Sequence, residues 1–160
     1  MEQLQLRDIA GYLPYGLQVE YELRNGAKFS KTVGDCQVDA VCTGIPLLLP
    51  LSCLIEQIEH KGKTIVPIVE LAMIEGVCGL LDRYTFQESS QGYSIQFRSY
   101  EFAIEVLDSG VNIRVLSLAG NDYSVANQRA MWDFLDELHI DYRNLIGRGL
   151  AKDKRLFNNK

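Results

Sequence analysis

Residues 46–71 have the sequence PLLLPLSCLIEQIEHKGKTIVPIVEL, the most apolar stretch of the 160-residue chain, and the predicted fold is built outward from them. Two prolines bracket three leucines, and Ser52 then stands in an N-cap position. The following apolar residues recur at helical spacing, which predicts a helix; they are Leu51, Leu54, Ile55 and Ile58. Residues 64–71 are apolar again and predict a buried strand interrupted by Pro67. This stretch builds a core and carries no catalytic motif.

The chain before this stretch predicts a short helix followed by an antiparallel meander. Apolar residues share one face of a helix over residues 6–13. Residues 17–24 alternate apolar and polar side chains, the pattern of a half-buried strand. Asn25-Gly26 follows, which is the strongest short signal for a hairpin, so residues 27–33 become the partner strand. A third strand is expected over residues 37–43.

The chain after this stretch predicts more hairpins and then helices. Residues 84–99 contain two alternating runs around Ser89-Ser90-Gln91-Gly92, and residues 102–115 contain two more around a second turn. A helix is expected to begin at a cap formed by Asp122 or Ser124 and to end near Leu138. A second short helix is expected after Asp141, which is a suitable cap for it.

This order of elements predicts a single α+β domain over residues 1–151. We expect an antiparallel sheet of about five to seven strands, with about three or four short helices packed on one face or end. Residues 152–160 contain four Lys or Arg against one Asp, and we expect them to form a basic, frayed tail.

Composition excludes several classes of function. The net charge of −5 argues against nucleic-acid binding, which requires a basic face to neutralise phosphates. No apolar run reaches the roughly 20 residues that cross a bilayer, and the N-terminus has no signal-peptide pattern. The four cysteines form no CxxC pair, so we expect buried thiols in a reduced, cytoplasmic protein. The glycines form no phosphate-binding or Rossmann pattern, and we expect no cofactor.

The densest group of polar residues lies near the end of the chain. Asp133 and Glu137 are four residues apart on one helix face, where two carboxylates can hold a hard cation together. His139 and Asp141 then complete a candidate metal site. The alternative is a solvated helix face opposite the apolar stripe of the same helix.

Aromatic residues supply the second candidate site. Many rings lie on modest strands: Tyr12, Tyr15, Tyr93, Phe97, Tyr100 and Phe102. Core packing accounts for most of them, whereas exposed tyrosines are typical of recognition surfaces. Tyr93 and Tyr100 are the residues that we select as candidate binding residues.

Several blocks of the chain resemble a family of small uncharacterised proteins from prophages and other mobile elements of gut Bacteroidetes. The resemblance rests on Tyr12 to Leu17, on residues 46–71 with Val66-Pro67-Ile68, and on residues 132–151 with His139-Ile140-Asp141 and Gly149-Leu150-Ala151. Residues 75–125 show no such likeness. The resemblance implies that the protein belongs to a phage or mobile element of a gut bacterium. Because the family has no established activity, it assigns no catalytic residue.

These observations give one leading hypothesis and two alternatives. The leading hypothesis is a non-enzymatic accessory protein of a mobile element that binds a host or phage protein. The first alternative is a small metal-dependent enzyme that uses the acidic cluster at 133–141. The second is a nucleic-acid mimic that offers an acidic face to a basic protein. Self-association stays open as well, because only Lys28 and Lys31 protect the edge formed by residues 27–33.

Overall fold

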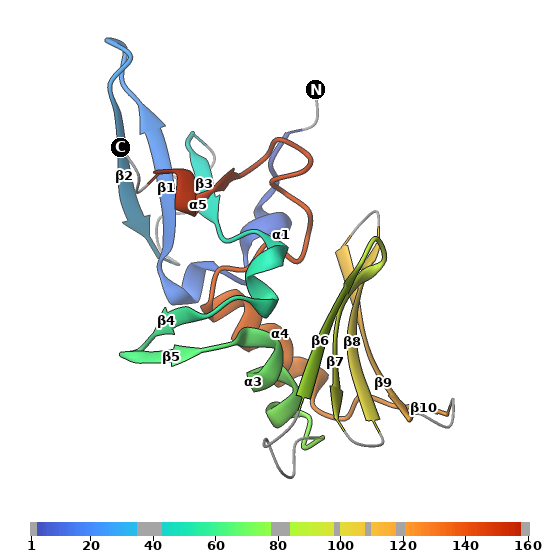
Figure 1. Ribbon diagram of the computed structural model, residues 1–160. Helices are drawn as coiled ribbons and strands as arrows, with labels where there is room; N and C mark the ends of the chain where they lie inside the picture. The colour runs from blue at the N-terminus through green and yellow to red at the C-terminus, as the bar shows by residue number, and fades with distance from the viewer. Residues whose placement is uncertain are drawn as a thin grey trace. The chain divides into compact units, whose positions relative to one another are not determined.

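The computed structural model describes residues 3–34, 43–77, 84–97, 100–107, 110–117 and 121–157, which form a mixed α+β fold (Figure 1). The predicted α+β class is confirmed. The chain divides into two compact units, Met1–Leu51 with Leu135–Lys160, and Ser52–Phe134. The expectation of a single domain stays a prediction. Within the described ranges, no helix is long and apolar enough to cross a membrane.

The first unit is a four-stranded sheet with short helices. Its elements are α1 (Leu6–Ile9), η1 (Leu13–Tyr15, a 3-10 helix), β1 (Leu17–Glu22), β2 (Lys28–Val33), β3 (Ile45–Leu48), β11 (Lys152–Asp153) and α5 (Lys154–Phe157). The strand order is β11-β3-β1-β2, with β2 at one edge (Figure 1). β1 and β2 form the hairpin that Asn25-Gly26 predicts, and β3 pairs antiparallel with β1.

The end of the chain belongs to this sheet. Lys152 lies opposite Leu47, so that β11 pairs parallel with β3, and α5 follows directly. Residues 152–157 are therefore regular elements and not the frayed tail expected, while 158–160 lie outside the described residues. Of the strand expected at 37–43, only Thr43 lies within them.

The second unit contains a five-stranded antiparallel sheet. Its elements are η3 (Leu51–Ile55, a 3-10 helix), β4 (Ile58–His60), β5 (Lys63–Ile65), α3 (Pro67–Ile74), β6 (Tyr84–Ser89), β7 (Gly92–Phe97), β8 (Tyr100–Leu107), β9 (Gly110–Ser117), β10 (Asp122–Tyr123) and α4 (Gln128–Glu137), whose last residues belong to the first unit. The order is β10-β9-β8-β7-β6, with every pair antiparallel. The hairpins predicted at 84–99 and 102–115 are confirmed.

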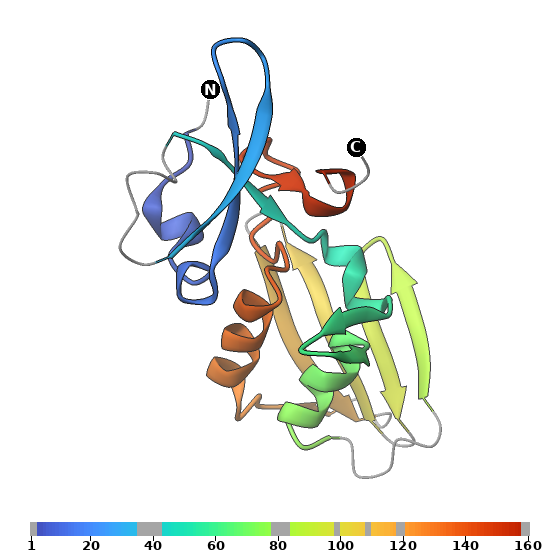
Figure 2. The same cartoon turned by 90° about the vertical axis from the view of Figure 1, so that its left-hand side faces the viewer.

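One face of this sheet is the core of the second unit. α3 packs against β7, and α3 and the start of α4 lie on the same side of the sheet (Figure 2). Alternate residues of the central strands point to this face, as the two-residue period requires. Those most completely buried are Ile95, Phe102, Ile104, Ile113 and Val115.

The sequence prediction is wrong in two parts of residues 46–71. The helix expected from Leu51 to Ile58 is only the 3-10 helix η3, and Ile58 begins β4. The strand expected at 64–71 ends at Ile65, and Pro67 begins α3. Proline is well tolerated at the first position of a helix, because its missing N–H has no partner there in any case. The same residue therefore starts a helix instead of interrupting a strand.

The start of α4 is also a correction. The helix begins at Gln128 and not at a cap formed by Asp122 or Ser124, because Asp122 pairs with Leu116 in β10. The carboxylate of Glu75 accepts hydrogen bonds from the backbone N–H groups of Ala126 (2.7 Å) and Asn127 (2.9 Å). A residue distant in sequence thus satisfies donors at this helix start.

Candidate functional site

Four exposed aromatic side chains lie on the core-forming face of the five-stranded sheet, beyond the part that the helices bury. They are Tyr84 (39% exposed), Phe86 (36%), Tyr100 (41%) and Tyr123 (48%), and we call them the aromatic surface. Opposed residues of an antiparallel pair point to the same face. Tyr84 lies opposite Phe97, which in turn lies opposite Tyr100, so these three share the face.

The rings of the aromatic surface are in contact with one another. The centroids of Tyr84 and Phe86 are 5.0 Å apart, and those of Tyr100 and Tyr123 are 5.8 Å apart. Both pairs have the edge-to-face geometry that aromatic rings prefer. The buried ring of Phe97 lies 6.3 Å from Tyr84, so the surface continues into the core. Such rings present apolar area at low cost in side-chain entropy.

The strand β6, which carries Tyr84 and Phe86, is the edge of its sheet. All six of its residues are exposed, and no described strand pairs with its outer side (Figure 1). It contains neither Lys, Arg nor Pro, the residues that commonly protect edge strands from pairing. The other long edge, β2, carries Lys28 and Lys31. Of the two long edges, β6 is the less protected.

The structure separates the two candidate binding residues selected from the sequence. Tyr100 belongs to the aromatic surface and contacts Tyr123. Tyr93 is half-buried, and its pKa is raised by burial first and then by Glu88, Glu56 and Cys53. Its ring therefore lies in the partly covered portion of the face, near η3.

Sequence reasoning missed Tyr84, Phe86 and Tyr123. The signal for the first two was present, since residues 84–87 alternate aromatic with polar side chains and carry no charge. That alternation predicts a strand but not whether a neighbour covers it.

The candidate metal ligands are divided between the two units, with Asp133 in the second and Glu137, His139 and Asp141 in the first. Asp133 is exposed and lies 3.8 Å from the guanidinium of Arg129. Both carboxylate oxygens of Asp141 accept backbone N–H groups, from Leu145 (2.8 Å) and Ile146 (2.7 Å), and burial raises the pKa of this carboxyl. Asp141 thus caps the segment that follows, as predicted, although that segment forms turns and not a helix. Across the described ranges, no three His, Cys, Asp or Glu residues are placed to hold a metal ion.

His139 is buried and neutral. Burial lowers its pKa to about 4, and the positive charge of Lys154 acts in the same direction. Opposing these, a hydrogen bond with the Tyr12 backbone and the negative charge of Glu137 favour the protonated ring. Its Nε2 atom has no hydrogen-bond partner among the residues that the structure describes. A neutral, buried imidazole here is a packing element beside the Tyr12 ring, whose centroid lies 6.3 Å away.

A buried polar network ties the start of the chain to the segment around His139. The Tyr12 hydroxyl donates to the carbonyl of Ile140 (3.0 Å), and the Tyr142 hydroxyl donates to Asp136 (2.8 Å). Burial raises the pKa of both tyrosines, that of Tyr142 to about 12, so both hydroxyls remain donors. Arg143 donates to the Tyr142 oxygen (2.9 Å). Both hydroxyls are therefore satisfied, whereas the buried Nε of Arg143 has no hydrogen-bond partner among the described residues.

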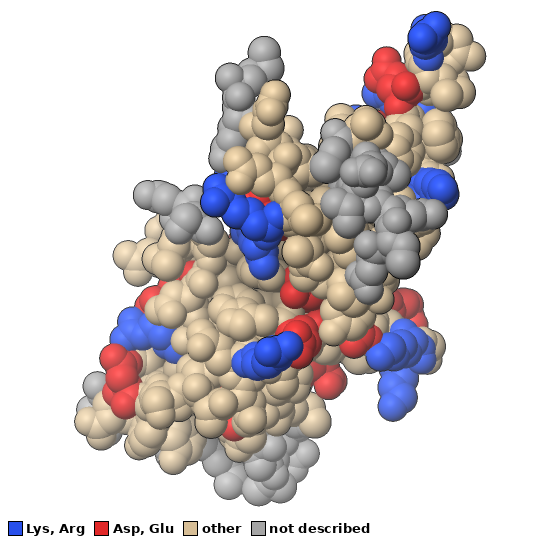
Figure 3. Space-filling model, turned by 180° about the vertical axis from the view of Figure 1, so that it is seen from behind, with Lys and Arg blue, Asp and Glu red and all other residues tan. Residues whose placement is uncertain are grey.

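Charge is mixed where it is visible. On the face shown in Figure 3, Lys and Arg alternate with Asp and Glu in small groups, and neither sign forms a continuous patch.

No family model matches the chain, nor does any curated protein or solved structure.

Proposed function

We propose that this chain is a non-enzymatic protein-binding module whose β6 edge adds an extended strand of a partner protein to the five-stranded sheet. The observation that carries the proposal is the combination of a six-residue edge without Lys, Arg or Pro with the exposed rings of Tyr84 and Phe86 on it.

Strand addition uses two kinds of contact, and β6 offers both. About half of the backbone N–H and C=O groups of an edge strand point away from its only neighbour, so they are free to form a new ladder. Side-chain contacts then give specificity at alternate positions. Tyr84 and Phe86 occupy such alternate positions on the apolar face. The partner segment is therefore extended, free of proline, and apolar at every second residue.

The other edges are less suitable for this role. β10 and β11 contain two residues each, too few for a stable ladder. β2 is as long as β6, but Lys28 and Lys31 add charge along it. Its exposed ring, Phe29 (42% exposed), stacks on Tyr21 at 5.3 Å. β2 therefore supplies a matched control within the same molecule.

The mobile-element setting rests on the sequence resemblance alone. The metal-dependent enzyme has no supporting observation in the described part of the chain, since Asp141 is engaged as a cap and Asp133 lies against Arg129. Protein binding needs neither a metal nor a catalytic group.

The test compares Phe86→Lys with Phe29→Lys. Tagged wild type and both variants are used to capture proteins from a host lysate, with a tag-only control and mass spectrometry. We expect one stoichiometric partner with the wild type and with Phe29→Lys, and its loss with Phe86→Lys. Both rings are more than a third exposed, so we expect both variants to fold, which circular dichroism checks.

Equal capture by Phe86→Lys and wild type would contradict pairing at β6. Binding lost only with Phe29→Lys would move the site to β2. Sedimentation of the purified chain examines self-pairing, because a second copy joined through β6 would give a dimer that Phe86→Lys dissociates.

A further inference from the structure

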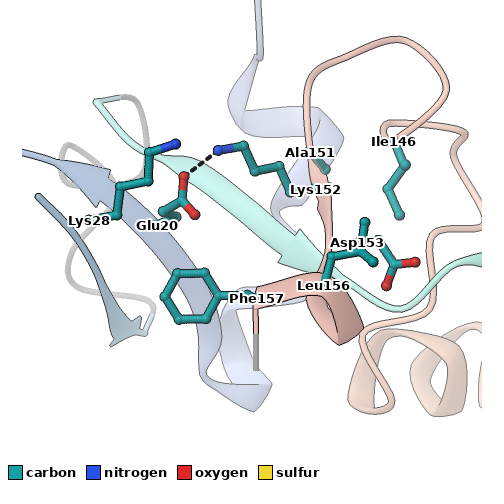
Figure 4. A pocket seen from close by; sticks show the side chains of 8 residues that line it. All are labelled: Glu20, Lys28, Ile146, Ala151, Lys152, Asp153, Leu156 and Phe157. Atoms are coloured by element: carbon teal, nitrogen blue, oxygen red, sulfur yellow. Dashed lines mark hydrogen bonds and ion pairs between the residues drawn. The ribbon is translucent and has the colours of Figure 1, made fainter. Parts of the chain in front are cut away.

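The first unit contains a pocket of about 620 Å³ that none of the preceding argument uses. It lies between the β1–β2 hairpin and the end of the chain, and Figure 4 shows its lining. The described residues that line it are Glu20, Lys28, Ile146, Ala151, Lys152, Asp153, Leu156 and Phe157. Its volume is within the range of small-molecule sites, roughly 300–1,000 Å³.

The charged groups of this pocket differ in how tightly they are paired. The buried carboxylate of Glu20 is bound by the ammonium of Lys152. Asp153 is engaged by Arg155, with its Nη2 at 2.9 Å and its backbone N–H at 2.9 Å. Although burial acts to raise it, the pKa of Asp153 is lowered by these bonds. Both carboxylates therefore have a cation already.

Lys28 is the most weakly paired charge of the lining. Its ion pair with Glu22, at 3.8 Å, is exposed at both ends and contributes little. Figure 4 shows the amino groups of Lys28 and Lys152 at the same end of the pocket, where Glu20 also lies. One carboxylate cannot satisfy two ammonium groups fully, so this end favours an additional anion.

The remaining wall is largely apolar. Ile146, Leu156 and Phe157 line it, and Leu156 is among the most exposed apolar residues of the described chain. Pockets of this composition, apolar with a few polar groups at one end, bind amphipathic small molecules.

We infer that this pocket binds a small apolar molecule carrying a single carboxylate, of the fatty-acid type. The carboxylate lies between Lys28 and Lys152, and the hydrocarbon lies against Leu156 and Phe157. A cationic ligand is disfavoured, because Glu20 and Asp153 are already paired within the fold.

The experiment titrates the full chain with decanoate, decylammonium and decanol, which share a hydrocarbon and differ in charge. Calorimetry measures affinity, and amide chemical shifts in ¹H–¹⁵N spectra locate the bound molecule. The informative variant is Lys28→Met, and its control is Lys31→Met on the same strand, because Lys31 is exposed and does not line the pocket. Neither lysine has a buried side chain, so we expect both variants to fold.

We expect decanoate to shift the amides of residues 146, 151 and 156, and to bind at least tenfold more tightly than decylammonium or decanol. Loss of one charge-assisted contact should weaken decanoate by about tenfold in Lys28→Met and leave Lys31→Met unchanged. Equal affinities for the three probes, or unchanged decanoate affinity in Lys28→Met, would overturn the inference. So would binding of an apolar peptide with a free C-terminus in the absence of decanoate binding, which would indicate a peptide-end site.

Discussion

His139 should make the folded protein sensitive to acid, and the chain allows this effect to be isolated. The sequence contains two histidines, so His60 is the natural control. His139 is buried, and its φ of 57° lies in the left-handed region. Asparagine tolerates that conformation better than most residues and does not titrate, which makes His139→Asn the appropriate variant.

The size of the effect follows from the shift in the pKa. Burial, with Lys154, lowers the pKa of His139 from 6.5 to about 4. Each pKa unit corresponds to about 1.4 kcal/mol, so the free energy of unfolding should change by about 3 kcal/mol. Above pH 6.5 the imidazole is neutral in both states and contributes nothing to the pH dependence. Between 6.5 and about 4 only the unfolded chain binds the proton, so stability falls as the pH falls. Below about 4 both states are protonated and the loss stops.

Other buried groups also titrate between pH 6.5 and 4, so their contribution to the pH dependence must be subtracted. The raised pKa of Asp141 acts in the opposite direction, because the folded state then binds a proton more readily than the unfolded chain. The quantity to measure is therefore the difference in unfolding free energy between wild type and His139→Asn, determined in urea from about pH 7 to about pH 4. Contributions common to both proteins cancel in that difference.

As the pH falls from 6.5 to about 4, we expect the wild type to lose about 3 kcal/mol more unfolding free energy than His139→Asn. The ring signals of the two histidines, observed by NMR, give a direct check: the His139 signal should titrate near pH 4. His60→Asn removes the other histidine and so assigns the His139 signal. A His139 signal that titrates near 6.5, or a difference that is independent of pH, would refute the assignment of a buried neutral imidazole.

Three further predictions concern stability, each measured by urea unfolding. Gly11→Ala places a Cβ against the carboxylate of Asp136 and should cost about 1–3 kcal/mol, whereas Gly34→Ala, whose Cβ meets none of the described atoms within 4 Å, should be close to neutral. Asp141→Ala removes the acceptor of two backbone N–H groups and should cost about 2 kcal/mol; an unchanged midpoint would contradict the capping role. Glu75→Ala leaves two donors before α4 without their carboxylate and should cost about 1 kcal/mol, with a matching loss of helical signal.

The strands that the sequence predicted well are those whose pattern is local. The alternation over residues 17–24 with Asn25-Gly26 gives β1 and β2, and residues 84–99 and 102–115 give β6 to β9. In each case a two-residue period and a short turn place both partners of a pair near each other in sequence. The α+β class follows from these hairpins together with the amphipathic helix at the end.

The stretch at 46–71 was predicted less well because its apolar residues have no clear period. A short apolar run is compatible with a helix or with a buried strand, and Pro67 is compatible with a strand break or a helix start. Packing resolves both questions: Ile68, Leu71 and Ala72 are fully buried when 67–74 is a helix on the sheet. The sequence could not predict the capping role of Glu75 either. Its carboxylate binds Ala126 and Asn127, which lie more than 50 positions later in the chain.

For the candidate sites, the sequence determined which chemical groups are present and not how they are exposed. It selected Tyr93 and Tyr100 as candidate binding residues, but only the tertiary structure decided that Tyr93 is partly covered and Tyr100 is open. It likewise showed a basic tail, whereas a bond between Lys152 and Glu20, 132 residues apart, holds that tail on the sheet. Periodicity is a property of neighbours in the chain, so the sequence fixes it. Burial and charge pairing depend on residues that only folding brings together.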